Sequence, residues 1–263
     1  MKLLTLNCHS WQESNQIDKI KYLAKVIIEN NYDVIALQEV SQHIDSKLCE
    51  GKLRADNYML LLKKELKKIC DWNFDSVWDF SHIGYDIYEE GLCILSKHKI
   101  THKDSFYVSR DETTDNWKSR KVVKASIDYK GEELDFISCH LGWWNDEEEP
   151  FKLQVEKLNK KVDSNKRTFL LGDFNNNANV RNEGYDFLKE SGWIDTYEIA
   201  LNKDEGSTVK GKIDGWDKNR ENLRLDLILT NKSVNVKSSE VIFNQKNKDI
   251  VSDHYGVEVY LNI

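Results

Sequence analysis

The sequence predicts an α/β fold in which two mixed β-sheets pack face to face, with helices on the outside. Three observations predict this fold. Segments with a helical spacing of apolar residues alternate with short apolar strands, five strand-like segments follow one another without a helix, and helix-bearing and hairpin-bearing segments occur in both halves. Each half therefore supplies material for a sheet and for the helices that cover it.

The first 40 residues predict a β-α-β unit. Residues 2–6 and 33–37 are apolar strands, and between them residues 15–30 have the spacing of an amphipathic helix. The inward-facing residues of this helix are Ile17, Ile20, Ala24 and Ile27. A right-handed crossover makes the two strands neighbours, so Asn7 and Glu39, which follow them, are expected at the same edge of the sheet.

The remaining elements follow from the same periodicities. Helices are expected near 58–70, 150–163 and 183–190. The first of these helices turns four residues inward, namely Met59, Leu62, Leu66 and Ile69. Strands are expected at 74–80, 91–97, 101–109, 121–129, 133–140, 168–173, 223–230, 234–243 and 256–263. The five strands before residue 140 indicate hairpins and an antiparallel portion of sheet.

Composition indicates one globular domain over residues 1–263. Hydrophobic residues make up 40% and charged residues 32%, there is one proline, and no linker or repeat divides the chain. No apolar run approaches the length that spans a bilayer, and the apolar start is too short for a signal peptide. We therefore expect a cytoplasmic protein with no membrane contact, and no feature implies a protein partner.

Charge and cysteine content narrow the classes of function. The net charge of −7 repels a phosphate backbone on average, so a nucleic-acid partner is not expected unless a local basic patch exists. The five cysteines are scattered and form no CxxC pair. Cys8, Cys93 and Cys139 lie in strand-like runs, so small buried hydrophobic residues are expected rather than disulfides or zinc ligands.

Polar residues collect where the predicted strands end. They are Asn7, Glu39, His140, Asp173, Asn175, Asp253 and His254, together with Asp226 inside the apolar run 223–229. Each alone has an ordinary explanation, such as a turn former, a core histidine or a solvated strand end. A carboxylate buried in a strand, such as Asp226, requires a cationic or hydrogen-bonding partner. The ordered set as a whole indicates a shared site.

The stretch 168–177 is the centre of this set. Phe169 to Leu171 reads as a buried strand, and Gly172 is expected to let the backbone turn. A side-chain period of two would then point Asp173 and Asn175 in the same direction. Burying a carboxylate beside an apolar strand is costly unless it binds something. For this stretch taken alone, a strand followed by an Asx-rich turn is the simpler explanation.

These residues lie within a set of seven short motifs. They are Leu4-Thr-Leu-Asn7, Leu37-Gln-Glu39, Gly91-Leu-Cys-Ile-Leu-Ser96, Ser138-Cys-His140, Gly172-Asp-Phe-Asn175, Arg224-Leu-Asp-Leu-Ile-Leu229 and Ser252-Asp-His254. In this order the motifs resemble those of the endonuclease/exonuclease/phosphatase superfamily, which includes abasic-site endonucleases, deoxyribonucleases, sphingomyelinases and inositol phosphatases. The resemblance covers nearly the whole chain. It implies a four-layer α/β sandwich with the site at one edge of the two sheets.

The resemblance also implies a ligand set and roles. Glu39, with Asn7 and Asp253 nearby, matches the Mg²⁺ site, and Mn²⁺ is the alternative metal. Asp173 matches the residue that orients or deprotonates the attacking water.

Further matches concern the phosphoryl group. Asn175 matches a donor to its oxygens, and His140 matches a second imidazole that faces it. His254 matches the imidazole that stabilises developing charge, and Asp226 holds that imidazole in its charged form. Glu90 is aligned with a glutamate that pairs with His140.

These residue types suit in-line attack on phosphorus. Arg120 is aligned with a phosphate-contacting arginine. The reaction places charge on the equatorial and leaving oxygens, which a metal, imidazolium groups and amide donors neutralise. No cysteine or serine lies in a nucleophile motif, so we predict inversion at phosphorus without a covalent intermediate.

The loops after the strands favour a small sugar phosphate as the substrate. Trp143, Trp144 and Trp216 lie near the motifs and are candidates for a platform under a sugar or a base, or alternatively for plugs of the sandwich core. The neighbouring loops are rich in acids and amides, which hydrogen-bond hydroxyls and repel a duplex. Residues 147–149 alternatively form a solvated cap on the following helix.

Two loops, 78–86 and 140–146, resemble those of a cytosolic bacterial branch that includes maltose 6'-phosphate phosphatase. This finer resemblance implies a phosphomonoesterase that releases a disaccharide. A nuclease of the abasic-site or exonuclease III type is the main alternative, and a sphingomyelinase-like phosphodiesterase is a lesser one. A catalytically dead scaffold would lack core residues, and none is missing.

Overall fold

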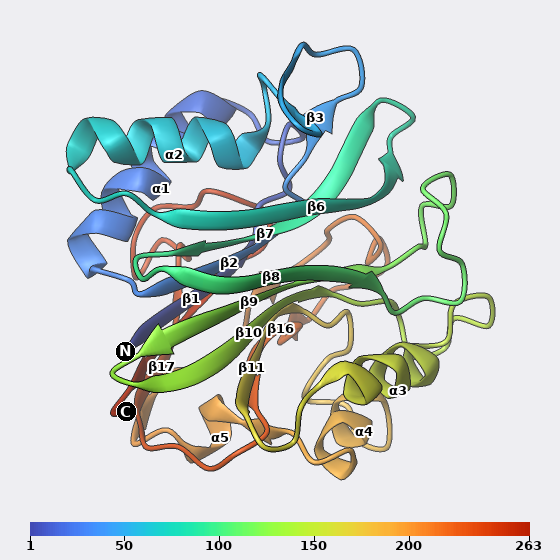
Figure 1. Cartoon of the computed structure of the whole chain (residues 1–263). Helices are drawn as coiled ribbons and strands as arrows, with labels where there is room; N and C mark the ends of the chain where they lie inside the picture. Colours follow the sequence, from blue (N-terminus) through green and yellow to red (C-terminus); the bar gives the residue numbers. More distant parts are fainter.

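The computed structural model describes residues 1–263 as two large β-sheets with helices on their outer faces (Figure 1). The first sheet contains β1 (Lys2–Asn7), β2 (Val34–Gln38), β3 (Gln42–His43), β6 (Asp75–Gly84), β7 (Tyr88–Ser96), β13 (Asn202–Lys203), β17 (Val236–Ile242) and β18 (Gly256–Leu261). Its strands run in the order β13-β17-β18-β1-β2-β7-β3, and β6 also pairs with β7. Strands β1 and β2 are parallel, whereas β1 and β18 are antiparallel, so the sheet is mixed.

The second sheet packs against the first. It contains β8 (Ile100–Tyr107), β9 (Lys121–Tyr129), β10 (Glu132–His140), β11 (Arg167–Asp173), β12 (Ile194–Asp195) and β16 (Asp226–Thr230). Its order is β12-β16-β11-β10-β9-β8, with β10 and β11 parallel and the pair β9 and β10 antiparallel. The remaining strands form two separate two-stranded ribbons. One pairs β4 (Leu48–Glu50) with β5 (Leu53–Arg54), and the other pairs β14 (Val209–Lys210) with β15 (Asn222–Leu223).

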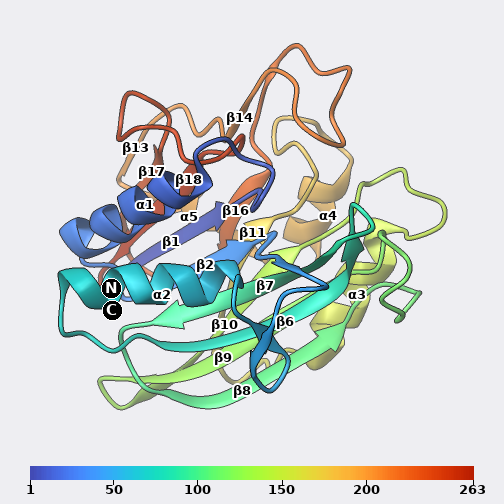
Figure 2. The same cartoon turned by 90° about the horizontal axis from the view of Figure 1, so that it is seen from above.

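The helices form the two outer layers. They are α1 (Gln16–Asn30), α2 (Tyr58–Ile69), α3 (Phe151–Lys161), α4 (Gly184–Glu190) and the short α5 (Thr196–Ile199). Helices α1 and α2 cover the first sheet, and α3 and α4 cover the second (Figures 1 and 2). The predicted four-layer α/β sandwich is therefore confirmed. No helix has both the length and the apolar character needed to cross a bilayer.

Three apolar clusters hold the layers together. Leu23 and Leu62 join the helices to the first sheet, and Phe151 joins α3 to the second. Between the sheets, the rings of Phe136 and Phe169 stack with their centroids 5.3 Å apart. Each such fully buried side chain contributes roughly 1.5–3 kcal/mol relative to its exposed state, so the layers are fixed firmly enough to hold an edge site.

Three local predictions differ from the structure. Ile17 and Ile69 were expected to face the core but are 47% and 48% exposed, because each lies on the terminal turn of its helix. The single strand expected over 223–230 is split into β15 and β16, and Arg224 lies in the gap. The hairpins of the middle segment and the buried states of Cys8, Cys93 and Cys139 are confirmed.

Candidate active site

The predicted site lies where the strands of both sheets end. Asn7 and Gln38 are paired at the ends of the parallel strands β1 and β2, and Glu39 follows directly. His140 and Asp173 are likewise paired at the ends of β10 and β11. Parallel pairing carries successive strand ends to one edge, so residues far apart in sequence meet there.

Gly172 permits this meeting by a close approach rather than by the expected turn. It lies inside β11, opposite Cys139 of β10. A Cβ atom at this position would come within 1.8 Å of the Cys139 carbonyl oxygen. Only glycine therefore lets β11 lie this close to β10 beside Asp173.

Asp173 lies at the centre of the cluster. Its Oδ2 accepts a hydrogen bond from Asn7 Nδ2 at 3.2 Å, and the same amide group donates to Glu39 Oε1 at 2.7 Å. The Nε2 atoms of His140 and His254 both lie 3.7 Å from Asp173 Oδ2. His140 Nε2 is also 4.0 Å from Glu39 Oε1. The structure thus brings four of the other expected residues together around the Asp173 carboxylate.

His254 is held in its charged form by two buried acids. Its Nδ1 atom lies 2.9 Å from Asp226 Oδ2, and Asp226 is paired with Asp173 across β16 and β11. Burial alone would lower the pKa of His254, but the charges of Asp226 and Asp173 outweigh it and raise the pKa well above the usual value. The partner expected for the buried Asp226 is therefore this imidazolium.

Removal from solvent raises the pKa values of the two central carboxylates. Burial raises the pKa of Glu39 to about 8, with a further contribution from the Glu90 charge. Burial also raises the pKa of Asp173 to about 6, although His254 opposes the shift. Carboxylates in such an environment favour an additional cation nearby.

Asn175 does not continue the strand alternation that was expected. Its φ of 49° is left-handed, and its backbone N–H donates to Asp173 Oδ1 at 2.8 Å. The Asx-turn alternative is therefore correct for the backbone. The side chain is held by two further bonds, one to the Leu141 carbonyl at 3.0 Å and one from Trp216 Nε1 at 3.0 Å. Trp216 is thus brought to the site as a support for Asn175.

Glu90 pairs with a histidine that the sequence did not single out. His82 Nε2 lies 3.3 Å from Glu90 Oε1, whereas Glu90 and His140 are outside ion-pair distance. Burial raises the pKa of Glu90, but the charges of His82, His140 and Arg120 outweigh it and lower the pKa to about 2. His82 and Glu90 are cross-strand partners in the β6–β7 hairpin, so hairpin register was the signal available for finding His82.

Arg120 is a buried cation without an ion-pair partner. It is 4% exposed, it donates to the Trp117 carbonyl at 3.0 Å, and no carboxylate lies within ion-pair distance. Its Nε atom is buried without a hydrogen-bond partner, and so is Trp143 Nε1. The guanidinium carbon is 5.8 Å from the Trp143 ring. The acids that act on Arg120 include Glu90 and Asp173, so it belongs to the same site.

The tryptophans after His140 point in different directions. Trp143 contacts Trp117, with ring centroids 6.1 Å apart, and packs against Gly215, where a Cβ atom would meet the ring at 2.7 Å. Trp144 instead packs against Phe151 and Phe187 of α3 and α4. The structure therefore places Trp143 with the site and Trp144 with the outer helical layer.

Asp253 lies in a small cluster beside Glu39. Its Oδ1 atom is 3.6 Å from His9 Nδ1, which is 3.0 Å from Glu13 Oε1. The donor atoms of this cluster lie within 4.8 Å of one another, as do those of Asp173, Asp226 and His254. Each group offers two carboxylates and one imidazole, and the carboxylate oxygens are ligands that a hard divalent cation prefers. His9 was not singled out, although its place two residues after Asn7 was visible.

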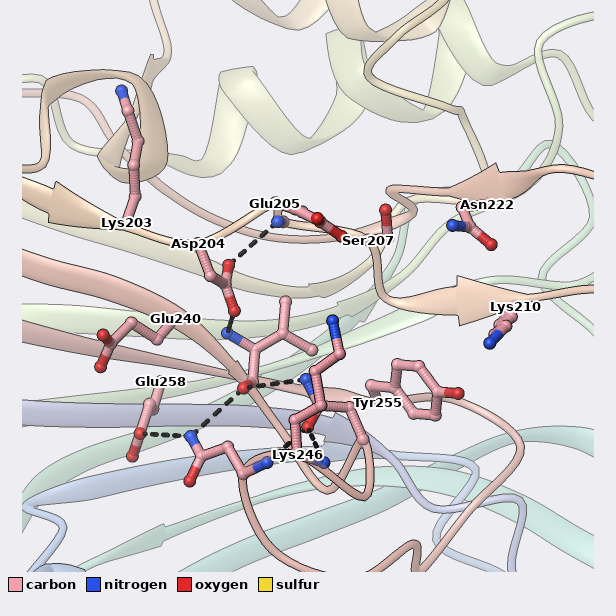
Figure 3. A pocket seen from close by; sticks show the side chains of 14 residues that line it. Lys203, Asp204, Glu205, Ser207, Lys210, Asn222, Glu240, Lys246, Tyr255 and Glu258 are labelled. Atoms are coloured by element: carbon pink, nitrogen blue, oxygen red, sulfur yellow. Dashed lines mark hydrogen bonds between the residues drawn. The ribbon is translucent and has the colours of Figure 1, made fainter.

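A wide polar groove of about 870 Å³ lies outside this cluster and contains none of the expected residues (Figure 3). Several of its polar side chains form hydrogen bonds with other residues that line the groove. Asp204 accepts from the N–H groups of Gly206 and Val241, and Asn247 donates to Glu258. The groove therefore contributes no residue to the candidate site.

Comparisons with known proteins agree with the fold and the motifs. A model of the endonuclease/exonuclease/phosphatase family matches residues 5–254. A member of that family from Leptotrichia buccalis C-1013-b is 40% identical, with a TM-score of 0.95 and 100% of both chains covered. A comparison with curated proteins found no match.

More distant structures share the fold alone. A mannosyl-6-phosphatase from Bacteroides thetaiotaomicron VPI-5482 is 17% identical, with a TM-score of 0.71 and 100% of both chains covered. Truncated TDP2 from Caenorhabditis elegans is 16% identical, with a TM-score of 0.64 over 100% of this chain and 97% of that one. The chain belongs to the endonuclease/exonuclease/phosphatase family, whose members are metal-dependent hydrolases of phosphoesters.

Proposed function

We propose that the protein is a phosphomonoesterase that removes the terminal phosphate of a small sugar phosphate. The observation that carries this proposal is the pair of buried, unpartnered donors, Arg120 Nε and Trp143 Nε1, beside the Asp173 cluster. Leaving buried donors unpaired is costly, so a ligand that accepts their hydrogen bonds is favoured. A phosphate monoester carries more negative charge than a diester, which suits a second fixed cation in addition to His254.

The metal would be held by Glu39, with Asn7 and Asp253 beside it. The carboxylates of Glu13 and Asp253 lie close together around His9, and carboxylate oxygens suit Mg²⁺ or Mn²⁺. When bound, the ion neutralises charge on the phosphoryl oxygens.

The protein groups would divide the remaining work. Asp173 accepts the proton of the attacking water, since Asn7 and His254 hold it in place. His254, kept charged by Asp226, donates to the phosphoryl group as charge develops there. These two roles require no covalent intermediate, so we expect inversion at phosphorus.

The other residues would bind the phosphoryl group. His140 and Arg120 face it from the side of the second sheet, and Asn175 keeps one amide hydrogen free because its other bonds go to Leu141 and Trp216. Glu90 and His82 form an ion pair near Arg120 and His140 and act as residues that position these two side chains.

The sugar would lie against the aromatic wall. Trp117 is 54% exposed and meets Trp143 edge to face, which leaves the Trp117 indole accessible beside Arg120. Aromatic faces of this kind suit the apolar face of a sugar ring. The mannosyl-6-phosphatase with the same fold supports a sugar 6-phosphate as the class, and maltose 6'-phosphate remains the specific candidate.

Phosphate release tests this function. Purified protein with Mg²⁺ is assayed on maltose 6'-phosphate and mannose 6-phosphate, with EDTA as the control. We expect rapid release from at least one ester and its loss with EDTA. Release from neither ester, together with salt-sensitive cleavage of abasic-site DNA, would replace the phosphatase by the nuclease alternative.

A further inference from the structure

Two exposed residues join the halves of the molecule above the site. Tyr85 lies at the tip of the β6–β7 hairpin, and Asp214 lies in the connection between β14 and β15. The Tyr85 hydroxyl donates a hydrogen bond to Asp214 Oδ2, although the residues are 129 positions apart. This bond therefore joins the β6–β7 hairpin of the first sheet to the separate β14–β15 ribbon, which leads in sequence into β16 of the second sheet.

Several contacts place the bridge over the metal-binding carboxylates. Asp214 Oδ2 is 3.9 Å from His9 Nε2, and the N–H of His9 donates to Asn7 Oδ1 at 3.1 Å. On the far side, Gly215 packs against Trp143. Burial, the Asp214 bond and the charge of Glu39 all raise the pKa of the Tyr85 hydroxyl, which places Tyr85 near Glu39.

The backbone keeps Tyr85 in this direction. Tyr85 and Asp86 have φ values of 50° and 62°, and the Ile87 N–H donates to the Gly84 carbonyl at 3.2 Å. Two successive left-handed residues form the tight hairpin turn that matches the twist of paired strands. Tyrosine seldom adopts this conformation, whereas aspartate tolerates it, so Tyr85 is held in the turn by its surroundings, including the Asp214 bond.

We propose that the Tyr85–Asp214 bridge determines specificity by roofing the phosphate site. The phosphate of a monoester carries one organic substituent, so it can reach Asp173 from one side without space for a second substituent. The phosphate of a diester, such as one within a nucleic-acid strand, has substituents on both sides, and one of them must displace the Tyr85–Asp214 bridge. The exposed acids Asp214 and Asp86 add repulsion for a polyanion. This inference rests on the proposed function and explains its preference for monoesters.

The test compares two simple esters. Tyr85→Phe removes the hydroxyl and Asp214→Ala removes the acceptor, while Tyr88→Phe alters a tyrosine of the same hairpin whose ring contacts His43. For each protein with Mg²⁺, kcat/KM is measured on p-nitrophenyl phosphate and on bis(p-nitrophenyl) phosphate. We expect the monoester-to-diester ratio to fall about fivefold in the first two variants, the size of one exposed hydrogen bond, and to stay unchanged in the third.

The outcomes separate the two proposals. Unchanged ratios in Tyr85→Phe and Asp214→Ala, with sugar phosphate still hydrolysed by the wild type, would overturn the bridge and leave the function. A lower monoester-to-diester ratio in these variants, with no phosphate release from sugar phosphates, would support the role of the bridge and contradict the sugar-phosphate function. Inactivity of the wild type on every ester with Mg²⁺ would overturn both.

Discussion

Asp173 is held on three sides, by hydrogen bonds from the Asn7 amide and the Asn175 N–H and by the His254 imidazole at ion-pair distance. Each partner comes from a different part of the chain, so the carboxylate is fixed in position before any substrate arrives. Fixed groups contribute to catalysis because they need no reorganisation in the transition state. The proposed chemistry therefore depends on how these individual side chains hold the Asp173 carboxylate.

At this scale the two adjacent tryptophans should behave differently. Trp143→Ala should raise the KM for a sugar phosphate roughly tenfold, or about 1.4 kcal/mol, because it removes the wall beside Arg120. Trp144→Ala should leave KM unchanged and lower stability by about 2 kcal/mol, because it removes packing against Phe151 and Phe187. Steady-state kinetics and thermal unfolding measure both effects, and a larger KM change for Trp144→Ala would reverse the assignment.

Sequence reasoning found the residues that sit in motifs and missed those fixed by tertiary contacts. Asn7, Glu39, Asp173 and His254 were found because strand ends converge in this fold. His82 and His9 were missed because their partners, Glu90 and Asp253, are identified only by hairpin register and by loop packing. The direction of Trp144 likewise depends on where α3 and α4 pack.

At the scale of elements, the approach of β10 to β11 sets the geometry of the site. Gly172→Ala would drive a Cβ atom into the Cys139 carbonyl oxygen, and neither backbone can yield without breaking the strand pairing. We expect a loss of about 4 kcal/mol or more, or failure to fold.

The matched control for this prediction is Gly131→Ala. Gly131 has a φ of 84° and open space around its Cβ position, so the expected loss is only about 1–2 kcal/mol, the cost of the left-handed backbone. Denaturant unfolding gives both values. Equal losses in the two variants would show that the close approach at Gly172 is not what the fold requires.

The main elements were predictable because their periodicities are long and regular. The short strands β3–β5 and β12–β14 and the helix α5 were not predicted, since two to four residues carry no periodic signal. The break between β15 and β16 has a tertiary cause. Arg224 bonds to the buried Asp195 and lies 4.3 Å from the Tyr197 ring, and neither partner is visible from the apolar run itself.

At the scale of the whole molecule, two mixed sheets bring residues from both ends of the chain to one edge. Asn7 and His254 are separated by nearly the whole sequence, yet both bond or approach Asp173. The layered architecture followed from the alternation of helices and hairpins, and the family motifs located the edge. The contact between the loops of Tyr85 and Asp214, by contrast, could not be predicted from the sequence, because it has no sequence signature.

The most direct measurement is phosphate release by His254→Ala beside the wild type, on the best sugar phosphate with Mg²⁺. The variant should lose roughly 10²–10³-fold in kcat, because the imidazolium that neutralises developing charge is gone. It should remain folded at the assay temperature but unfold at a lower temperature than the wild type, because the buried Asp226 loses its cationic partner. His102→Ala, at an exposed histidine of β8, should match the wild type in both respects. Wild-type turnover in His254→Ala would contradict the assignment of the site.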